Sequence, residues 1–295
     1  GGPSRMAAPF VKWSQAVTSR ETLAGSFARA CEIARMAPAG PAFLSVPIEY
    51  MQEEREETIP CIPVPRSKFS PNPADVEKIA ALLRESERPI IITERAGLQP
   101  KAVDKLVELA EALTLPVFEM SPACINFPKE HPLHAGYDAA QAIREADVIL
   151  VVAAAAPWDP QQTGPRPDAR VVFIDEQALY QQLPFWNYRA DMIVAADPLP
   201  VLEMLVDKVR AQGPVTNTRF GYWKAKHEEM IAAWDGQAHQ SKEKKPIDPR
   251  WLCSVINEWL PPDAIIVREL ITQSAAVTRL IRRTGPGNLY AGNIR

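Results

Sequence analysis

Cysteine is scarce in this sequence, and the sequence contains no apolar run long enough to span a membrane. The four cysteines among 295 residues lie far apart and form no C-x-x-C pair, which argues against a zinc ribbon or a redox-active dithiol. We predict that Cys31, Cys61, Cys124 and Cys253 are reduced packing residues. No apolar run approaches the ~20 residues of a transmembrane helix, and no signal-peptide pattern follows Gly1. These absences predict a cytoplasmic protein with no membrane partner.

A strong excess of either charge is also lacking. The net charge is −3 and the two signs are interspersed, so no nucleic-acid partner is expected. The one basic cluster, at residues 242–245, is more typical of a solvated linker. No G-x-S-x-G nucleophile elbow, phosphate-binding P-loop or H-E-x-x-H motif occurs. The common signatures of serine hydrolases, P-loop enzymes and zinc peptidases are therefore absent.

What the sequence does contain is a regular alternation of strands and helices. Residues 148–153 and 171–174 are apolar on both faces and rich in Val and Ile, as neighbouring parallel strands covered by helices must be. The same reasoning predicts strands at 90–93, 115–120 and 192–195 and helices at 101–113, 139–145 and 199–209. Another predicted helix begins at Asn72 or Asp75 and ends at Arg84. The alternation predicts an α/β fold whose centre is a Rossmann-like, doubly wound parallel sheet of about six strands.

Partial α/β units are expected on both sides of this central domain. Before it, a helix at 23–34 and a strand at 43–46 precede a proline-rich stretch; after it come a helix starting at Asp248-Pro249, a strand at 264–267 and a helix at 272–283. On the first of these last helices, Trp251, Val255, Ile256 and Trp259 are predicted to face inward. We expect a partial unit at 1–58, a linker at 59–73, the central domain at 74–210, a second linker with a helix at 211–246, and another partial unit at 247–295.

Three segments carry a family resemblance. They are GPAFLSVP at residues 40–47, FPKEHPLHAG at 127–136 followed by ADVIL at 146–150, and residues 249–290. In this order and spacing they resemble the thiamine-diphosphate-dependent decarboxylase and synthase family, which includes acetohydroxyacid synthase, benzoylformate decarboxylase and oxalyl-CoA decarboxylase. The segments are similar, in turn, to the end of the family's pyrimidine-binding domain, to its central domain and to the opening of its diphosphate-binding domain.

The resemblance implies part of an enzyme that uses thiamine diphosphate and Mg²⁺ to decarboxylate or condense a 2-oxo acid or related acyl donor. It implies a homodimer or homotetramer for the complete protein. It also implies that the catalytic glutamate precedes Gly1 and that the Gly-Asp-Gly…Asn metal motif follows Arg295, so no catalytic or metal-binding residue is assigned here and this chain alone is expected to be inactive. The alternative, from a different class, is a free-standing nucleotide-binding or assembly module of Rossmann type.

One loop is a candidate for cofactor binding. Residues 269–274 (ELITQS) follow a predicted strand and open a predicted helix, so their backbone N–H groups and hydroxyls could hold an anion. In similar family members this loop touches the cofactor's diphosphate, which by position implies Glu269, Thr272 and Gln273 as cofactor-binding residues. The alternative is that Thr272 only caps the helix.

The central crevice near Glu94, Ala153 and Asp175 is predicted to hold neither FAD nor NAD. Some relatives bind FAD or an ADP-containing group in this domain, and Asp175 closes a strand where an acidic residue often meets a ribose. However, the turn at 94–97 carries Glu, Arg and Ala before its one Gly, and these side chains would crowd a pyrophosphate.

Two further features are interpreted as structural. The His131-x-x-His134 pair lies in a proline-containing stretch with no third ligand nearby, so a surface loop is predicted instead of a metal site. Trp158 is predicted to pack against a neighbouring domain and not to cover a ligand.

Overall fold

The computed structural model of the chain describes residues 2–36, 38–52, 69–177, 180, 183, 186–215 and 218–291. The chain divides into two compact units, residues 1–69 and residues 70–295. Most of the predicted linker at 59–73 lies outside the described ranges. Within those ranges, no helix is both long and apolar enough to cross a membrane.

The first unit is built on two parallel strands. β1 (Trp13–Ala16) pairs with β2 (Ala42–Ser45), and α2 (Leu23–Arg35) forms the crossover that parallel strands require. α2 and β2 confirm the predicted helix at 23–34 and the predicted strand at 43–46. Phe27 lies on α2 with 64% of its surface exposed, because a two-stranded sheet offers little area to cover a helix. The unit also contains α1 (Pro3–Ala7), the short 3-10 helix η1 (Ala8–Phe10) and α3 (Ile48–Gln52).

The second unit is centred on a parallel sheet of five strands in the order β4-β3-β5-β6-β7. In chain order this is the 2-1-3-4-5 arrangement of doubly wound folds, and the strand order reverses between β3 and β5. The Rossmann-like fold is confirmed, with five strands where about six were expected. The strands are β3 (Pro89–Thr93), β4 (Val117–Glu119), β5 (Val148–Val152), β6 (Arg170–Ile174) and β7 (Met192–Val194).

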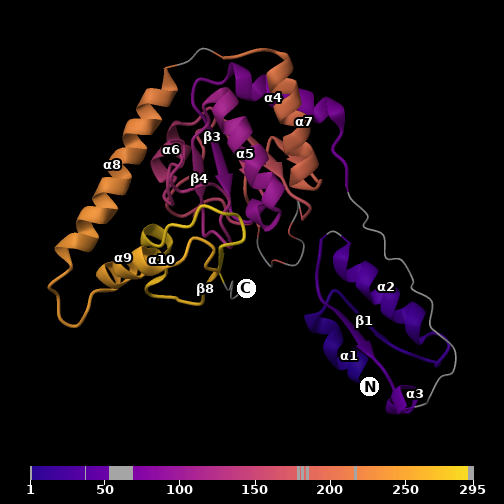
Figure 1. Cartoon of the computed structure of the whole chain (residues 1–295). Coiled ribbons are helices and arrows are strands. Elements are labelled where there is room, and N and C mark those ends of the chain that lie inside the picture. The colour runs from indigo at the N-terminus through magenta and orange to yellow at the C-terminus, as the bar shows by residue number, and fades with distance from the viewer. Residues whose placement is uncertain are drawn as a thin grey trace. The chain divides into compact units, whose positions relative to one another are not determined.

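Helices cover both faces of this sheet (Figure 1). Successive side chains of a strand point to opposite faces, so Ile91 packs in one core and Ile90 in the other. β3 and β5 are buried along their whole length, which is why they read as continuous apolar runs. The first core contains α4 (Pro73–Glu85), α5 (Pro100–Leu113) and α7 (Pro198–Ala211), and the second contains α6 (Ala140–Glu145); the short helix η2 (Ala96–Leu98) follows β3.

The last part of the second unit packs three helices around a small apolar core that includes Trp234, Cys253 and Val277. Cys253 is the residue of α9 that is buried in this core. Ile256 and Trp259, which were predicted to face inward, are 38% and 83% exposed, so the apolar stripe of α9 does not face the core. The elements are α8 (Arg219–Gln240), α9 (Pro249–Trp259), β8 (Ile266–Arg268), α10 (Ser274–Leu280) and β9 (Leu289–Ala291), with β8 and β9 parallel.

The cysteines behave as predicted wherever the structure describes them. Cys124 and Cys253 are buried with free thiols, and Cys31 is half-buried and free. Burial raises the pKa of the Cys124 thiol to about 12, with the nearby Glu119 carboxylate adding to the effect, so this sulfur is a poor nucleophile. Cys61 lies outside the described residues.

Candidate functional site

The predicted cofactor loop connects β8 to α10. Glu269, Thr272 and Gln273 are all exposed, and they occupy the turn between the strand and the helix as the sequence predicted. Gln273 is the N-cap residue of α10, and its side chain makes no capping hydrogen bond. Thr272 precedes the N-cap, so the geometry does not favour the alternative in which its hydroxyl caps the helix. The hydroxyl and the amide are exposed, which is what contact with a ligand would require.

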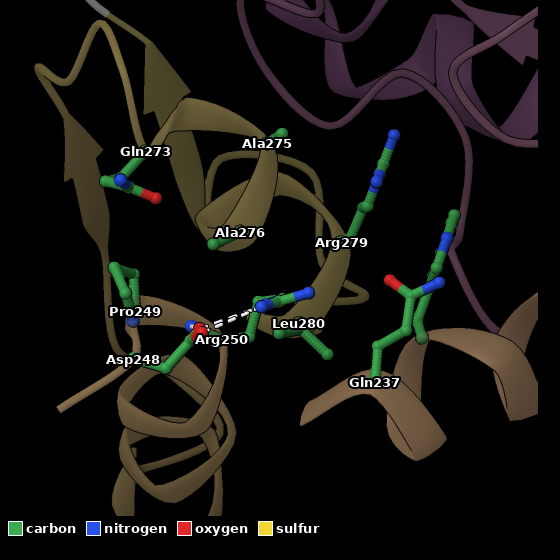
Figure 2. A pocket seen from close by; sticks show the side chains of 10 residues that line it. Gln237, Asp248, Pro249, Arg250, Gln273, Ala275, Ala276, Arg279 and Leu280 are labelled. Carbon is green, nitrogen blue, oxygen red and sulfur yellow. Dashed lines mark hydrogen bonds and ion pairs between the residues drawn. The ribbon is translucent and has the colours of Figure 1, made fainter. Parts of the chain in front are cut away.

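A pocket of about 310 Å³ adjoins this loop, between α8, α9 and α10. Gln273 lines the pocket, whereas Glu269 and Thr272 do not. Figure 2 shows Gln273 on one side of the opening and Arg279 and Gln237 on the other. The structure thus brings one of the three predicted residues into a cavity and leaves the other two on the open surface.

The pocket contains charged side chains among apolar ones, and some of these charges are matched within it. The Asp248 carboxylate accepts hydrogen bonds from the Arg250 side chain at 2.7 and 2.9 Å and from the Arg250 backbone N–H at 2.9 Å (Figure 2). These bonds hold the pKa of Asp248 well below its usual range. The Arg279 guanidinium lies 6.0 Å from the centre of the Trp234 ring. No local sequence pattern could have indicated this cluster, because its members come from three separate helices.

A second candidate, the crevice where the strand order reverses, is filled by the protein's own side chains. Arg95 follows β3 and donates to Asp175 Oδ2 at 3.0 Å and to the Tyr180 hydroxyl at 2.8 Å. Tyr180 in turn donates to Asp175 Oδ2 at 2.5 Å, and its ring lies 5.6 Å from the Arg95 guanidinium. Burial raises the pKa of Tyr180 well above its usual value, and Asp175 adds to the shift, so the phenol stays protonated. Asp175, which could have met a ribose, is therefore already bonded.

The turn after β3 also leaves little room for a pyrophosphate. The Oε2 atom of Glu94 accepts a hydrogen bond from the N–H of Ala155 at 2.8 Å, which ties this turn to the end of β5. The one glycine of the turn, Gly97, is needed for packing, because a Cβ there would lie 1.8 Å from the carbonyl oxygen of Ile125. Ala153 has a φ of 49°, an uncommon conformation for a residue with a Cβ. These residues do not fit a dinucleotide.

His134 and Trp158, both interpreted as structural, lie in surroundings that differ from the predicted ones. His134 was predicted to lie in a surface loop, but it is fully buried and its Nε2 lies 3.0 Å from Glu119 Oε2. Trp158 is buried in its own domain, with its ring 5.2 Å from that of Tyr188, and not against a neighbouring domain. The loops fold back on the sheet and supply partners that lie far away in sequence. Among the residues that the structure describes, no three His, Cys, Asp or Glu side chains gather as a metal site would need.

The sequence of the chain is similar to those of known proteins. Residues 76–205 match the family described as "Thiamine pyrophosphate enzyme, central domain". The chain is 28% identical over 220 residues to a probable acetolactate synthase large subunit of Methanocaldococcus jannaschii, covering 67% of this chain and 36% of that protein. It is 28% identical over 157 residues to the oxalyl-CoA decarboxylase of Escherichia coli, covering 52% and 28%. The chain thus spans about a third of the length of these relatives or less.

Solved structures share the fold. A putative thiamin diphosphate-dependent enzyme from Mycobacterium smegmatis superposes with a TM-score of 0.77 at 20% identity, over 98% of this chain and 54% of that one. Benzoylformate decarboxylase from Polynucleobacter necessarius gives a TM-score of 0.74 at 20% identity, over 98% and 52%. At this identity the likeness concerns the fold alone.

Proposed function

We propose that this chain, whose residues 76–205 match the central domain of thiamine pyrophosphate enzymes, is part of an enzyme that decarboxylates or condenses a 2-oxo acid or a related acyl donor. The observation that carries the proposal is the match of residues 76–205 to that central domain. Acetolactate synthase, oxalyl-CoA decarboxylase and benzoylformate decarboxylase, the names of similar proteins, all point to this class of chemistry.

We assign Glu269, Thr272 and Gln273 to the binding of the cofactor, thiamine pyrophosphate (thiamine diphosphate). When bound, the cofactor would supply the carbon nucleophile and the electron sink for bond cleavage next to a carbonyl. The role of this chain would be to hold phosphate oxygens through the Thr272 hydroxyl, the Gln273 amide and the N–H groups that open α10, whose first turn has no acceptors within the helix. The exposure of these donors after a strand fits that role.

The metal and the catalytic groups are proposed to lie outside this chain. A Mg²⁺ that bridges a diphosphate to a protein needs carboxylate or amide oxygens, and no suitable cluster occurs among the described residues. We therefore assign no catalytic or metal-binding residue here and expect the chain to act as one part of a larger enzyme.

We further propose that the central domain is structural and binds no FAD. The bonds among Arg95, Asp175 and Tyr180, together with the close packing at Gly97, support this proposal. A nucleotide-binding module, the alternative function, would require this same crevice to be open. An assembly role, a homodimer or homotetramer and a cytoplasmic location stay predictions, as do the five segments with boundaries at 58, 73, 210 and 246.

A substitution in the candidate loop tests the cofactor assignment. In a polypeptide that extends this chain to the length of its relatives, Thr272→Val should weaken binding of thiamine diphosphate by about 1–3 kcal/mol, because a buried phosphate oxygen would lose its hydroxyl partner. Thr218→Val is the control, since Thr218 is another exposed threonine at a helix start without a side-chain cap. Isothermal titration in excess Mg²⁺ measures the difference. Equal affinities for the two variants would remove Thr272 from the site.

A further inference from the structure

Lys129 is a buried cation that joins two parts of the second unit. It lies in the segment between β4 and α6 with only 3% of its surface exposed. Its Nζ donates to the carbonyl oxygens of Thr278 at 2.6 Å and Ile281 at 2.9 Å, more than 140 residues along the chain. These two carbonyls lie at the C-terminal end of α10, the helix whose other end carries the candidate cofactor loop.

The chemistry of a helix end explains why a lysine serves here. The last carbonyl groups of a helix lack partners within it and carry partial negative charge. A lysine near such an end is usually supplied by the helix itself, but here it comes from the central domain. An apolar side chain in its place would strand both carbonyls in a buried position.

A buried polar network centred on Glu119 lies close enough to influence the charge of Lys129. Glu119 Oε1 accepts hydrogen bonds from the backbone N–H of Asn126 at 2.8 Å and from its side-chain amide at 3.1 Å, and Glu119 Oε2 pairs with His134. Burial lowers the pKa of Lys129 to about 8 and the Glu119 carboxylate opposes this shift, while Arg268, Arg282 and Arg283 reinforce it. The amine therefore still carries its charge at neutral pH.

Other contacts converge on the same helix from the same side. Arg268, at the end of β8, donates to the carbonyl oxygen of Pro122 at 3.1 Å and to the Thr278 hydroxyl. The Tyr137 hydroxyl donates to the carbonyl oxygen of Thr278 at 3.2 Å. The strand and the helix that flank residues 269–273 are thus both tied to the segment that follows β4.

We propose that Lys129 is a positioning residue, which holds α10 against the central domain and so fixes the loop at residues 269–273. The meaning of this role for catalysis rests on the proposed function, since that function makes the loop a cofactor contact. The positioning itself is a property of this chain and does not require a cofactor.

Hydrogen exchange of the 295-residue chain tests the inference without any ligand. In Lys129→Met, which keeps the length of the side chain but removes the donors, amides of residues 276–281 should exchange on the order of tenfold faster than in the unsubstituted chain. The amides of Ala276 and Val277 report on the loop, because they donate to the carbonyl oxygen of Gln273. Amides of β3 and β5 serve as the internal reference and should change much less. Lys105→Met is the control, because within the described ranges Lys105 pairs with Glu108 of its own helix, at 2.8 Å. Lys129→Arg, which keeps charge and donors, should restore part of the protection.

The outcomes separate local positioning from general stability. Faster exchange confined to residues 276–281 supports the inference. An equal increase in β3, β5 and α10, or unchanged exchange of the Ala276 and Val277 amides, would overturn it. No restoration by Lys129→Arg would also count against hydrogen bonding as the cause. The Thr272→Val titration tests the proposed function separately, so either result can fail without the other.

Discussion

At the scale of single residues, Gly97 shows how one atom can decide the structure of a turn. A Cβ at this position would lie 1.8 Å from the Ile125 carbonyl oxygen and 2.7 Å from the Ile125 carbonyl carbon, both backbone atoms that cannot rotate away. The N–H of Gly97 also donates to Asn126 Oδ1 at 3.0 Å, which draws the two segments together. The glycine is therefore required for close approach of two chain segments, and not for contact with a phosphate.

Gly97→Ala should lower the free energy of unfolding by about 2–3 kcal/mol or more, because the clash forces the backbone at residues 125–126 to move. Gly164→Ala is the matched control, since a Cβ at Gly164 meets no atom within 4 Å and the variant should lose no stability. Urea unfolding followed by circular dichroism compares the two midpoints. Similar midpoints for both variants would show that the turn adapts and that the contact is not tight.

The sequence could predict which residues lie near the crevice but not how they interact. Arg95 and Asp175 were placed just after two buried strands from apolar runs alone, and the structure shows that they meet at the same edge of the sheet. Their bond to Tyr180 could not be predicted, because the sequence around that tyrosine has no periodicity. His134 was placed at the surface for a similar reason: its partner, Glu119, belongs to a short strand 15 residues away.

At the scale of elements, Arg219 joins the start of α8 to the ends of two other helices. Its guanidinium donates to the carbonyl oxygens of Ser86 at 2.8 Å and Glu87 at 3.0 Å, just after α4, and of Leu113 at 2.8 Å, the last residue of α5. On the other side of the same turn, the Asp147 carboxylate accepts from the N–H groups of Glu87 and Arg88. One arginine thus satisfies helix-end carbonyls that have no partners within their helices.

Arg219→Met should reduce the free energy of unfolding by about 2–3 kcal/mol, since hydrogen bonds to a charged, partly buried group are lost and three carbonyls are left without this donor. Arg210→Met is the control, because Arg210 forms a surface ion pair with Glu108 and should contribute at most about 1 kcal/mol. Chemical unfolding monitored by circular dichroism gives both values. A loss for Arg219→Met no larger than that of the control would contradict the capping role.

Elements whose signals are local were predicted well, and elements that depend on distant partners were not. α4 starts where its sequence indicates, because the Asn72 side chain caps the N–H of Ala74 at 3.0 Å. β9 was missed, since a strand of three residues is too short to show a periodicity and is recognised only by its pairing with β8. The inward face of α9 was misplaced for a related reason: periodicity identifies an apolar stripe but not the surface that covers it.

At the scale of the whole molecule, this chain unites one complete sheet with two small ones. The five-stranded sheet has helices on both faces, whereas β1 with β2 and β8 with β9 are two-stranded sheets. Sheets of two strands seldom bury enough apolar area to be stable without further packing. Ile265 and Val267, on or beside β8, are 66% and 73% exposed, in keeping with this arrangement. The family match lies on the one complete domain.

We predict that the isolated chain neither binds the cofactor nor acts as a catalyst. Its candidate loop offers a hydroxyl, an amide and helix N–H groups to a diphosphate, but the described residues provide no carboxylate cluster for the Mg²⁺ that would neutralise the phosphate charge. The part of this chain that matches covers 36% of the acetolactate synthase relative and 28% of the oxalyl-CoA decarboxylase relative. We therefore expect titration of the 295-residue chain with thiamine diphosphate and Mg²⁺ to show no binding at micromolar concentration. We also expect the chain to release no carbon dioxide from pyruvate or benzoylformate.

A polypeptide extended at both ends to the length of the relatives should bind the cofactor and turn over a 2-oxo acid. Tight binding by the chain alone would place the metal site within it, and an extended protein that is inactive on a broad panel of 2-oxo acids would count against the enzymatic function.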